Sequence, residues 1–148
     1  MEAEKKQFVV FRLGDEEYGT DIIKVTVIER MLNIARVPTT PAYIRGVINL
    51  RGDIIPVMDL RTRLGLPEKA EDDDTRIIIF DINKIVFGTI VDSVSEVLQL
   101  EESKIESAVG IINDSSLDYI NGVAKAESKL VTLINLERLI SELVPELS

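Results

Sequence analysis

The chain has 148 residues, 45% of them hydrophobic and 29% charged, and a formal net charge of −9. It contains no His and no Cys, which excludes disulfides, thiolate metal sites and the commonest general base, so a binding module is favoured over an enzyme. The negative charge disfavours nucleic-acid binding and association with anionic lipid. No apolar stretch is long enough to span a bilayer, so we expect no direct membrane insertion and a cytoplasmic location.

The sequence repeats itself once. The matched stretches are residues 9–25 with 78–94, at a shift of 69, and residues 43–64 with 119–140, at a shift of 76. Glycines coincide in both matches, Gly19 with Gly88 and Gly46 with Gly122. Chance similarity of apolar strings explains the alternation but not glycines at a fixed offset, because Gly marks special backbone demands. We therefore predict one domain over residues 1–148, with copies at about 8–66 and 76–143 and a loop at 67–75.

Each copy begins with a predicted hairpin. In the first copy an apolar run over residues 8–13 meets a polar break at 14–17, which predicts a hairpin with a four-residue loop. In the second copy the break is Asn83–Lys84, which suits a two-residue turn. Whether the two copies exchange strands is open.

A short helical turn is predicted next, with Thr40 as the N-cap, Pro41 as the first helical residue and Gly46 at its end. A second hairpin follows, with its turn at Arg51–Gly52. Its second strand contains Pro56, which cannot donate to a sheet ladder, so we expect an edge strand or a bulge there.

Two helices are predicted from their caps. Asp59 and Asn135 stand at equivalent places before LRTRL and LERLISEL, and both residue types are good N-caps. The first helix should stop at Gly65 and Pro67, and the second should run to about residue 144. Together these elements predict a mainly-β fold: two small five-stranded β-barrel subdomains packed together, with short helices and a C-terminal helix.

Two acidic clusters raise sharper alternatives. Residues 68–74, EKAEDDD, read best as a solvated loop, because a calcium loop needs alternating ligands and a turn glycine. An acidic carboxylate hydrolase is the alternative suggested by Asp15, Glu16 and Glu17. A catalytic acid, however, needs burial or a like-charged neighbour to raise its pKa, and these residues lie on a predicted hairpin loop. We predict no catalytic residue and no metal site.

The motifs GVINLRG (46–52), IPVMDLR (55–61) and VPTTP (37–41) resemble the CheW family of bacterial chemotaxis, and the likeness runs from about residue 8 to 143. The resemblance implies a fold of two five-stranded barrels, no catalytic step and no cofactor. It also implies an adaptor that couples the tips of methyl-accepting chemotaxis receptors to the regulatory domain of the histidine kinase CheA, in arrays at the inner face of the membrane. The alternative is a CheW-like module of another two-component system.

The resemblance also implies receptor-binding residues: Val25, Gly46, Asn49, Arg51 and Val97. Taken alone, Arg51 is either an interface arginine or a soluble turn residue, and Asn49 either binds a partner or closes the hairpin. Gly46 either stops a helix or allows a partner's backbone to approach closely. Val25 and Val97, taken alone, are expected in the core, because Val is usually buried.

The family often has Glu where this chain has Val27, so a pairing with Arg51 is lost or passes to Glu29. The apolar segment 105–112 docks into the core or offers a contact to the kinase or another adaptor through Ile105, Ile111 and Ile112.

Overall fold

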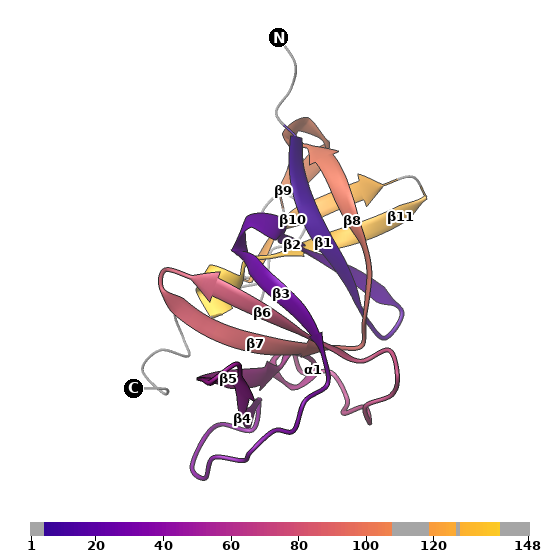
Figure 1. The fold of residues 1–148 in the computed structure, drawn as a ribbon. Coiled ribbons are helices and arrows are strands. Elements are labelled where there is room, and N and C mark those ends of the chain that lie inside the picture. Colours follow the sequence, from indigo (N-terminus) through magenta and orange to yellow (C-terminus); the bar gives the residue numbers. More distant parts are fainter. Residues whose placement is uncertain (1–4, 108–118, 127, 140–148) are drawn as a thin grey trace. The chain divides into compact units, whose positions relative to one another are not determined.

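The computed structural model describes residues 5–107, 119–126 and 128–139, and strands dominate it (Figure 1). The elements in chain order are β1 (Lys5–Leu13), β2 (Glu16–Asp21), η1 (Ile22–Lys24), β3 (Val25–Arg30), β4 (Ile44–Leu50), β5 (Asp53–Asp59), α1 (Leu60–Arg63), β6 (Arg76–Ile82), β7 (Ile85–Val91), β8 (Ser93–Glu101), η2 (Glu102–Lys104), β9 (Ile105–Ser107), β10 (Ile120–Ala126) and β11 (Lys129–Ile134). Residues 136–139 are also helical.

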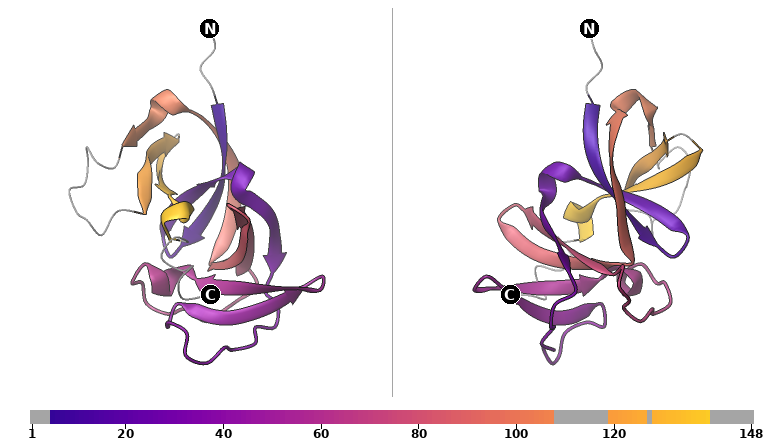
Figure 2. Two further views of the ribbon diagram at one scale, coloured as in Figure 1. Left: turned by 90° about the vertical axis from the view of Figure 1, so that its left-hand side faces the viewer. Right: turned by 45° about the vertical axis from the view of Figure 1, so that its right-hand side comes forward.

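The chain forms two compact units. Unit 1 comprises residues 1–22 and 95–148, and unit 2 comprises residues 23–94. Unit 1 holds a six-stranded sheet in the order β8-β1-β2-β11-β10-β9, and unit 2 a five-stranded sheet in the order β3-β6-β7-β5-β4 (Figure 2). The predicted mainly-β class with short helices is confirmed, although the two sheets have six and five strands rather than five each.

Each sheet combines strands from both halves of the sequence. The β1–β2 hairpin joins β8 to β11, and the β6–β7 hairpin joins β3 to β5. The two joints are parallel pairings, β2 with β11 and β7 with β5. The pairings β1–β2, β3–β6, β4–β5, β6–β7, β9–β10 and β10–β11 are antiparallel. Gly19 lies opposite Leu133 in one joint, and Gly88 lies opposite Val57 in the other. These positions correspond at the sequence shifts of 69 and 76, so equivalent segments make equivalent contacts.

The repeated glycines lie where a side chain would not fit. A Cβ atom on Gly19 would lie 2.9 Å from Leu133 Cδ2, and one on Gly88 would lie 2.9 Å from Ile77 Cγ2. Glycine therefore permits close packing of β2 against β11 at Gly19, and of β7 against β6 at Gly88.

Each unit has an apolar cluster of its own. In unit 1 the buried members are Phe8, Val10, Leu100, Ala124, Ala126, Val131 and Leu133. In unit 2 they are Ile48, Ile55, Val57, Ile77, Ile79 and Ile90. Both clusters come from alternate residues of several strands, as expected for curved sheets with one face turned inward.

The hairpin predicted at the start of each copy forms, as β1–β2 and as β6–β7. The β1–β2 loop is shorter than expected. Leu13 pairs directly with Glu16, so only two residues make the turn and β2 begins at Glu16. The predicted four-residue loop is wrong, because a positive φ of 64° at Gly14 allows a two-residue reversal. The predicted two-residue turn at Asn83–Lys84 is confirmed, with positive φ at both residues.

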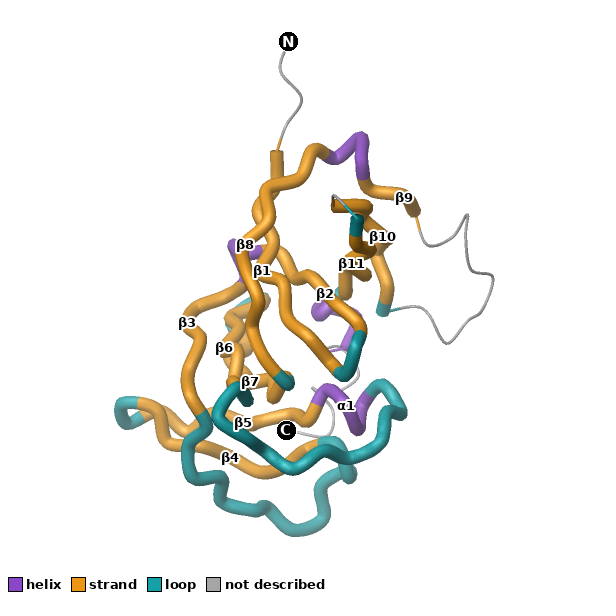
Figure 3. The backbone as a smooth tube through the Cα atoms, turned by 90° about the vertical axis from the view of Figure 1, so that its right-hand side faces the viewer, coloured by secondary structure: helices purple, strands orange, loops and turns teal. Residues whose placement is uncertain are grey.

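The helical turn predicted at Thr40 is wrong. The Ile44 amide donates to the Pro41 carbonyl at 2.9 Å, and β4 begins at Ile44. The Thr40 hydroxyl donates to the Val37 carbonyl instead of capping a helix. Gly46 lies inside β4 and ends nothing. Only residues 41–43 separate Thr40 from β4, so a single turn fits there in place of a helix. The loop that contains this turn is drawn in teal in Figure 3.

Of the two settings predicted for Pro56, the edge strand is wrong, since β5 lies between β4 and β7. The β4–β5 pairing does carry an irregularity close to Pro56, a register shift between Ile44 and Gly46. Val47, opposite Pro56, directs its amide and carbonyl towards Ala35, with both bonds at 2.9 Å. Pro56 therefore needs no bond from β4. Pairing with β7 begins at Val57, so the missing N–H of Pro56 interrupts no ladder.

Both predicted N-caps are confirmed. Asp59 Oδ1 accepts from the amides of Arg61 (3.0 Å) and Thr62 (3.4 Å), and Asn135 Oδ1 accepts from the Arg138 amide at 3.3 Å. The predicted stop of α1 is confirmed as well. The amides of Gly65 and Leu66 donate to carbonyls of α1, in the pattern of a Schellman motif.

Candidate functional site

The β4–β5 hairpin carries the side chains best placed for a partner. Its turn consists of Arg51 and Gly52, with φ of 54° and 92°, between the paired residues Leu50 and Asp53. Positive φ at both central residues is typical of the tight turns that match strand twist. Asn49 Oδ1 accepts from the Gly52 amide at 2.9 Å, so the local role of Asn49 in closing the hairpin is confirmed.

Arg51 is exposed at the tip of this hairpin. It forms no ion pair with Glu29, nor with any other residue in the described part of the chain. Val27 packs against the unit 2 cluster. The guanidinium therefore keeps its donors for water or for a partner.

Gly46 is buried, and its backbone is unusual. Its φ is 146°, and a Cβ atom there would collide with the Ala35 carbonyl. The Ala35–Val47 bridge fills this space with the chain's own backbone, so the structure gives Gly46 an internal role. Any part it plays in a contact is indirect, through the shape of β4.

Sequence reasoning missed Ile54. This side chain is 64% exposed and lies opposite Asn49 in the hairpin. The signal was present in the alternation of β5, because Ile55 and Val57 point inward and Ile54 must then point outward. Ile54, Asn49 and Arg51 give the hairpin an exposed apolar and polar tip.

The remaining candidates lie elsewhere. Val25 begins β3, is half-buried, and pairs with Phe80 next to a register shift in unit 2. Val97, in β8 of unit 1, is 52% exposed, so the base-rate expectation of a core residue is wrong there. Ile105 packs against the unit 1 cluster, in agreement with the core reading of that segment. Ile111 and Ile112 lie outside the described residues.

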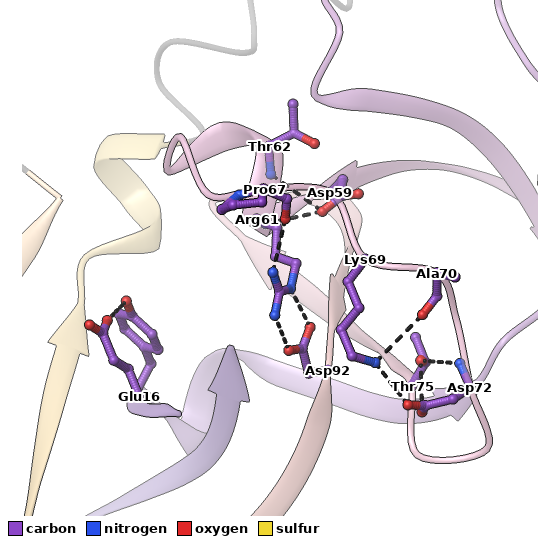
Figure 4. A network of polar contacts seen from close by, with 11 residues as sticks. Glu16, Asp59, Arg61, Thr62, Pro67, Lys69, Ala70, Asp72, Thr75 and Asp92 are labelled. Atoms are coloured by element: carbon purple, nitrogen blue, oxygen red, sulfur yellow. Dashed lines mark hydrogen bonds and ion pairs between the residues drawn. The ribbon is translucent and has the colours of Figure 1, made fainter. Parts of the chain in front are cut away.

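A polar network holds α1 in unit 2 (Figure 4). Arg61 donates from Nε and Nη2 to the two carboxylate oxygens of Asp92, at 2.7 and 2.6 Å, and both side chains are only 14% exposed. Nη1 of Arg61 donates to the Pro67 carbonyl at 2.9 Å. The bond to Asp92 raises the pKa of Arg61, so the pair stays ionised. The sequence predicted the cap at Asp59 but not this ion pair.

In the acidic loop after α1, the carboxylate of Asp72 is bound by groups of the same loop. Lys69 Nζ lies 2.8 Å from Asp72 Oδ2, and the amide of Asp74 donates to Asp72 Oδ1 at 2.9 Å. These bonds lower the pKa of Asp72 to about 2. In the part of the chain that the structure describes, no group of three or more acidic residues is arranged to hold a metal ion.

Two of the three carboxylates considered for a hydrolase, Glu16 and Glu17, bind neighbouring side chains. The Tyr18 hydroxyl donates to Glu16 at 2.6 Å, and Lys129 Nζ lies 3.1 Å from Glu17 Oε2. Burial and the bond to Glu16 raise the pKa of Tyr18 well above its ordinary value. Glu16 and Glu17 thus hold neighbouring side chains, which disfavours a catalytic role.

No helix among the described residues is long and apolar enough to cross a membrane. A family model described as "CheW-like domain" matches residues 7–144. The chain belongs to the CheW family. This confirms the resemblance carried by GVINLRG and IPVMDLR.

Named relatives support the same membership. The chain is 35% identical to the chemotaxis protein CheW of Klebsiella aerogenes, over 92% of this chain and 82% of that protein. It is 41% identical to the chemotaxis protein CheW of Bacillus subtilis, over 88% and 83% of the two chains. The crystal structure of the scaffolding protein TtCheW from Thermoanaerobacter tengcongensis superposes with a TM-score of 0.81, at 39% identity, over 88% of this chain and 89% of that one.

Proposed function

We propose that the chain is a non-enzymatic adaptor that couples the cytoplasmic tips of chemoreceptors to the regulatory domain of the histidine kinase CheA. The observation that carries this proposal is the CheW-like match over residues 7–144, together with a similar solved protein described as a scaffold. The adaptor would work in the cytoplasm, recruited to receptor arrays. It would act by holding two partners together, which raises their effective concentration.

The receptor contact is assigned to Val25, Asn49, Arg51 and Val97, and Gly46 supports it indirectly through the shape of β4. The exposed and unpaired guanidinium of Arg51 supports this assignment most directly, because interface hot spots are enriched in arginine. Ile54 joins the set as an exposed apolar neighbour. A contact to the kinase or to another adaptor is assigned to Ile111 and Ile112, whereas Ile105 packs against the unit 1 cluster.

The test is binding of the purified chain to a receptor cytoplasmic fragment and to the kinase regulatory domain, separately and together. Arg51→Glu should weaken receptor binding by roughly tenfold or more, in the range of a hot spot, and leave kinase binding unchanged.

Lys84→Glu is the matched control, because Lys84 is an exposed cation with positive φ on another two-residue turn of unit 2. Equal receptor binding by Arg51→Glu and wild type would move the receptor site elsewhere. No binding of folded wild type to either partner would favour a module of another two-component system.

A further inference from the structure

An ion-pair bridge in unit 1 lies beside one of the proposed receptor contacts. Lys129 Nζ lies 3.1 Å from Glu17 Oε2 and 3.3 Å from Glu96 Oε2. Glu96 directly precedes Val97 in β8. The three charged side chains are exposed to 33%, 18% and 43% for Lys129, Glu17 and Glu96, so the bridge is partly shielded from water.

The register places this bridge at the rim of the unit 1 cluster. Lys129 shares the inward face of β11 with Val131 and Leu133, and Glu96 shares the inward face of β8 with Leu98 and Leu100. On these faces Val131, Leu133 and Leu100 are buried and Leu98 is half-buried, whereas Lys129 is 33% and Glu96 43% exposed. The two charges therefore meet beside the cluster and not within it.

The bridge joins strands that are not hydrogen-bonded neighbours. In the sheet order, β1 and β2 separate β8 from β11. β8 is an edge strand, seen alongside β1 in Figure 1, so its ladder holds it from one side only. Ser95, Glu96, Val97 and Gln99 are exposed, and Leu98 is only half-buried. Leu98 attaches this segment to the unit 1 cluster, and the Glu96–Lys129 pair supplies a second attachment.

We propose that Lys129 is a positioning residue that acts through Glu96 to fix the exposed segment of β8 that presents Val97. The inference rests on the proposed function for the role of Val97 as a receptor contact. It adds a residue, Lys129, that affects receptor affinity without being a receptor contact itself. Glu17 provides a natural comparison, because it holds Lys129 from β2 and has no link to β8.

The first experiment measures the affinity of the full chain for a receptor cytoplasmic fragment and for the kinase regulatory domain. Glu96→Gln and Lys129→Met should each weaken receptor binding roughly three- to fivefold, the scale of a partly exposed ion pair. The double variant should be no weaker than either single one. Lys129→Arg should restore affinity, and Glu17→Gln should bind the receptor like wild type. Kinase binding reports that each variant is folded.

The second experiment measures amide hydrogen exchange over residues 95–99 without any partner. Glu96→Gln should speed exchange there roughly three- to fivefold more than Glu17→Gln does. Equal exchange in the two variants, or equal loss of receptor affinity, would overturn the positioning role. Faster exchange without any effect of Val97→Ser on receptor binding would keep the bridge as an anchor of β8 but contradict the receptor placement of Val97, a failure of the proposed function.

Discussion

Tyr18 couples the acidic hairpin to the core and makes stability depend on pH. Its ring stacks on Phe11 with centroids 5.8 Å apart, and burial with the bond to Glu16 raises its pKa above the ordinary 10.0. In the unfolded chain the phenol ionises near pH 10, whereas in the folded chain it stays protonated. The folded state therefore binds more protons above pH 10, and stability that is complete below pH 10 is lost as pH rises.

Wild type should lose free energy of unfolding between pH 10 and 11.5 more steeply than Tyr18→Phe, by up to about 1.4 kcal/mol per pH unit. Urea unfolding at pH 9, 10 and 11 measures the difference. Phe keeps the stacking on Phe11, and Lys129, whose pKa is also raised, contributes equally to both proteins. Parallel pH curves for the two proteins would contradict the prediction.

Gly46 distinguishes a structural residue from a contact residue. Alanine there would meet the Ala35 carbonyl and would have to adopt a φ of 146°. Gly46→Ala should cost roughly 2–4 kcal/mol of stability, from backbone strain and overpacking together. Thermal unfolding measures this loss, and kinase and receptor binding should then fall together. If Gly46→Ala were as stable as wild type and lost the receptor alone, the residue would be a direct contact.

At the scale of elements, the Arg61–Asp92 ion pair ties α1 to the residue that follows β7. Asp92→Asn leaves Arg61, only 14% exposed, without its bidentate partner. We expect a loss of about 1–3 kcal/mol in urea unfolding, the usual scale for a hydrogen bond to a charged group. Lys69→Met, which removes the exposed pair with Asp72, is the control and should change stability by less than about 0.5 kcal/mol. Similar losses in the two variants would contradict a special role for Arg61.

The elements show what the sequence could and could not predict. Caps and turns are set by neighbouring residues, so Asp59, Asn135 and the Asn83–Lys84 turn were predicted correctly. The Arg61–Asp92 pair joins residues 31 apart, and only the folded chain brings them together. Thr40–Pro41 carries a helix-start signal, but the space before β4 admits one turn. Of the candidate site, the exposed tip at Arg51 followed from the hairpin, whereas the burial of Gly46 depends on Ala35 from another segment.

At the scale of the whole molecule, the sequence predicted the fold class and the family but not the division into units. The repeat suggested copies at 8–66 and 76–143, an interpretation that stays a prediction. The compact units are residues 23–94 and the remainder. Local patterns fix each strand, whereas the parallel pairings that decide the units join β2 to β11 and β5 to β7 over long sequence separations. Such pairings leave no mark within a short window of sequence.

This division predicts how the chain behaves when it is cut. A break between Glu68 and Lys69, both exposed, leaves β1 to β5 on one fragment and β6 to β11 on the other. Each sheet then needs both fragments. Fragment 1–68 alone retains only the β1–β2 and β4–β5 hairpins, which are marginal without a larger sheet. It should therefore be unfolded by circular dichroism.

When fragment 1–68 is mixed with fragment 69–148, the two should form a 1:1 complex with strand content and one cooperative unfolding transition. Light scattering and circular dichroism of the mixture, compared with the sum of the separate spectra, measure this. The lost connection lowers stability by mass action, so the midpoint should rise with fragment concentration. Two fragments that fold separately and do not associate would mean that each half closes its own sheet, against the pairing of β2 with β11 and of β5 with β7.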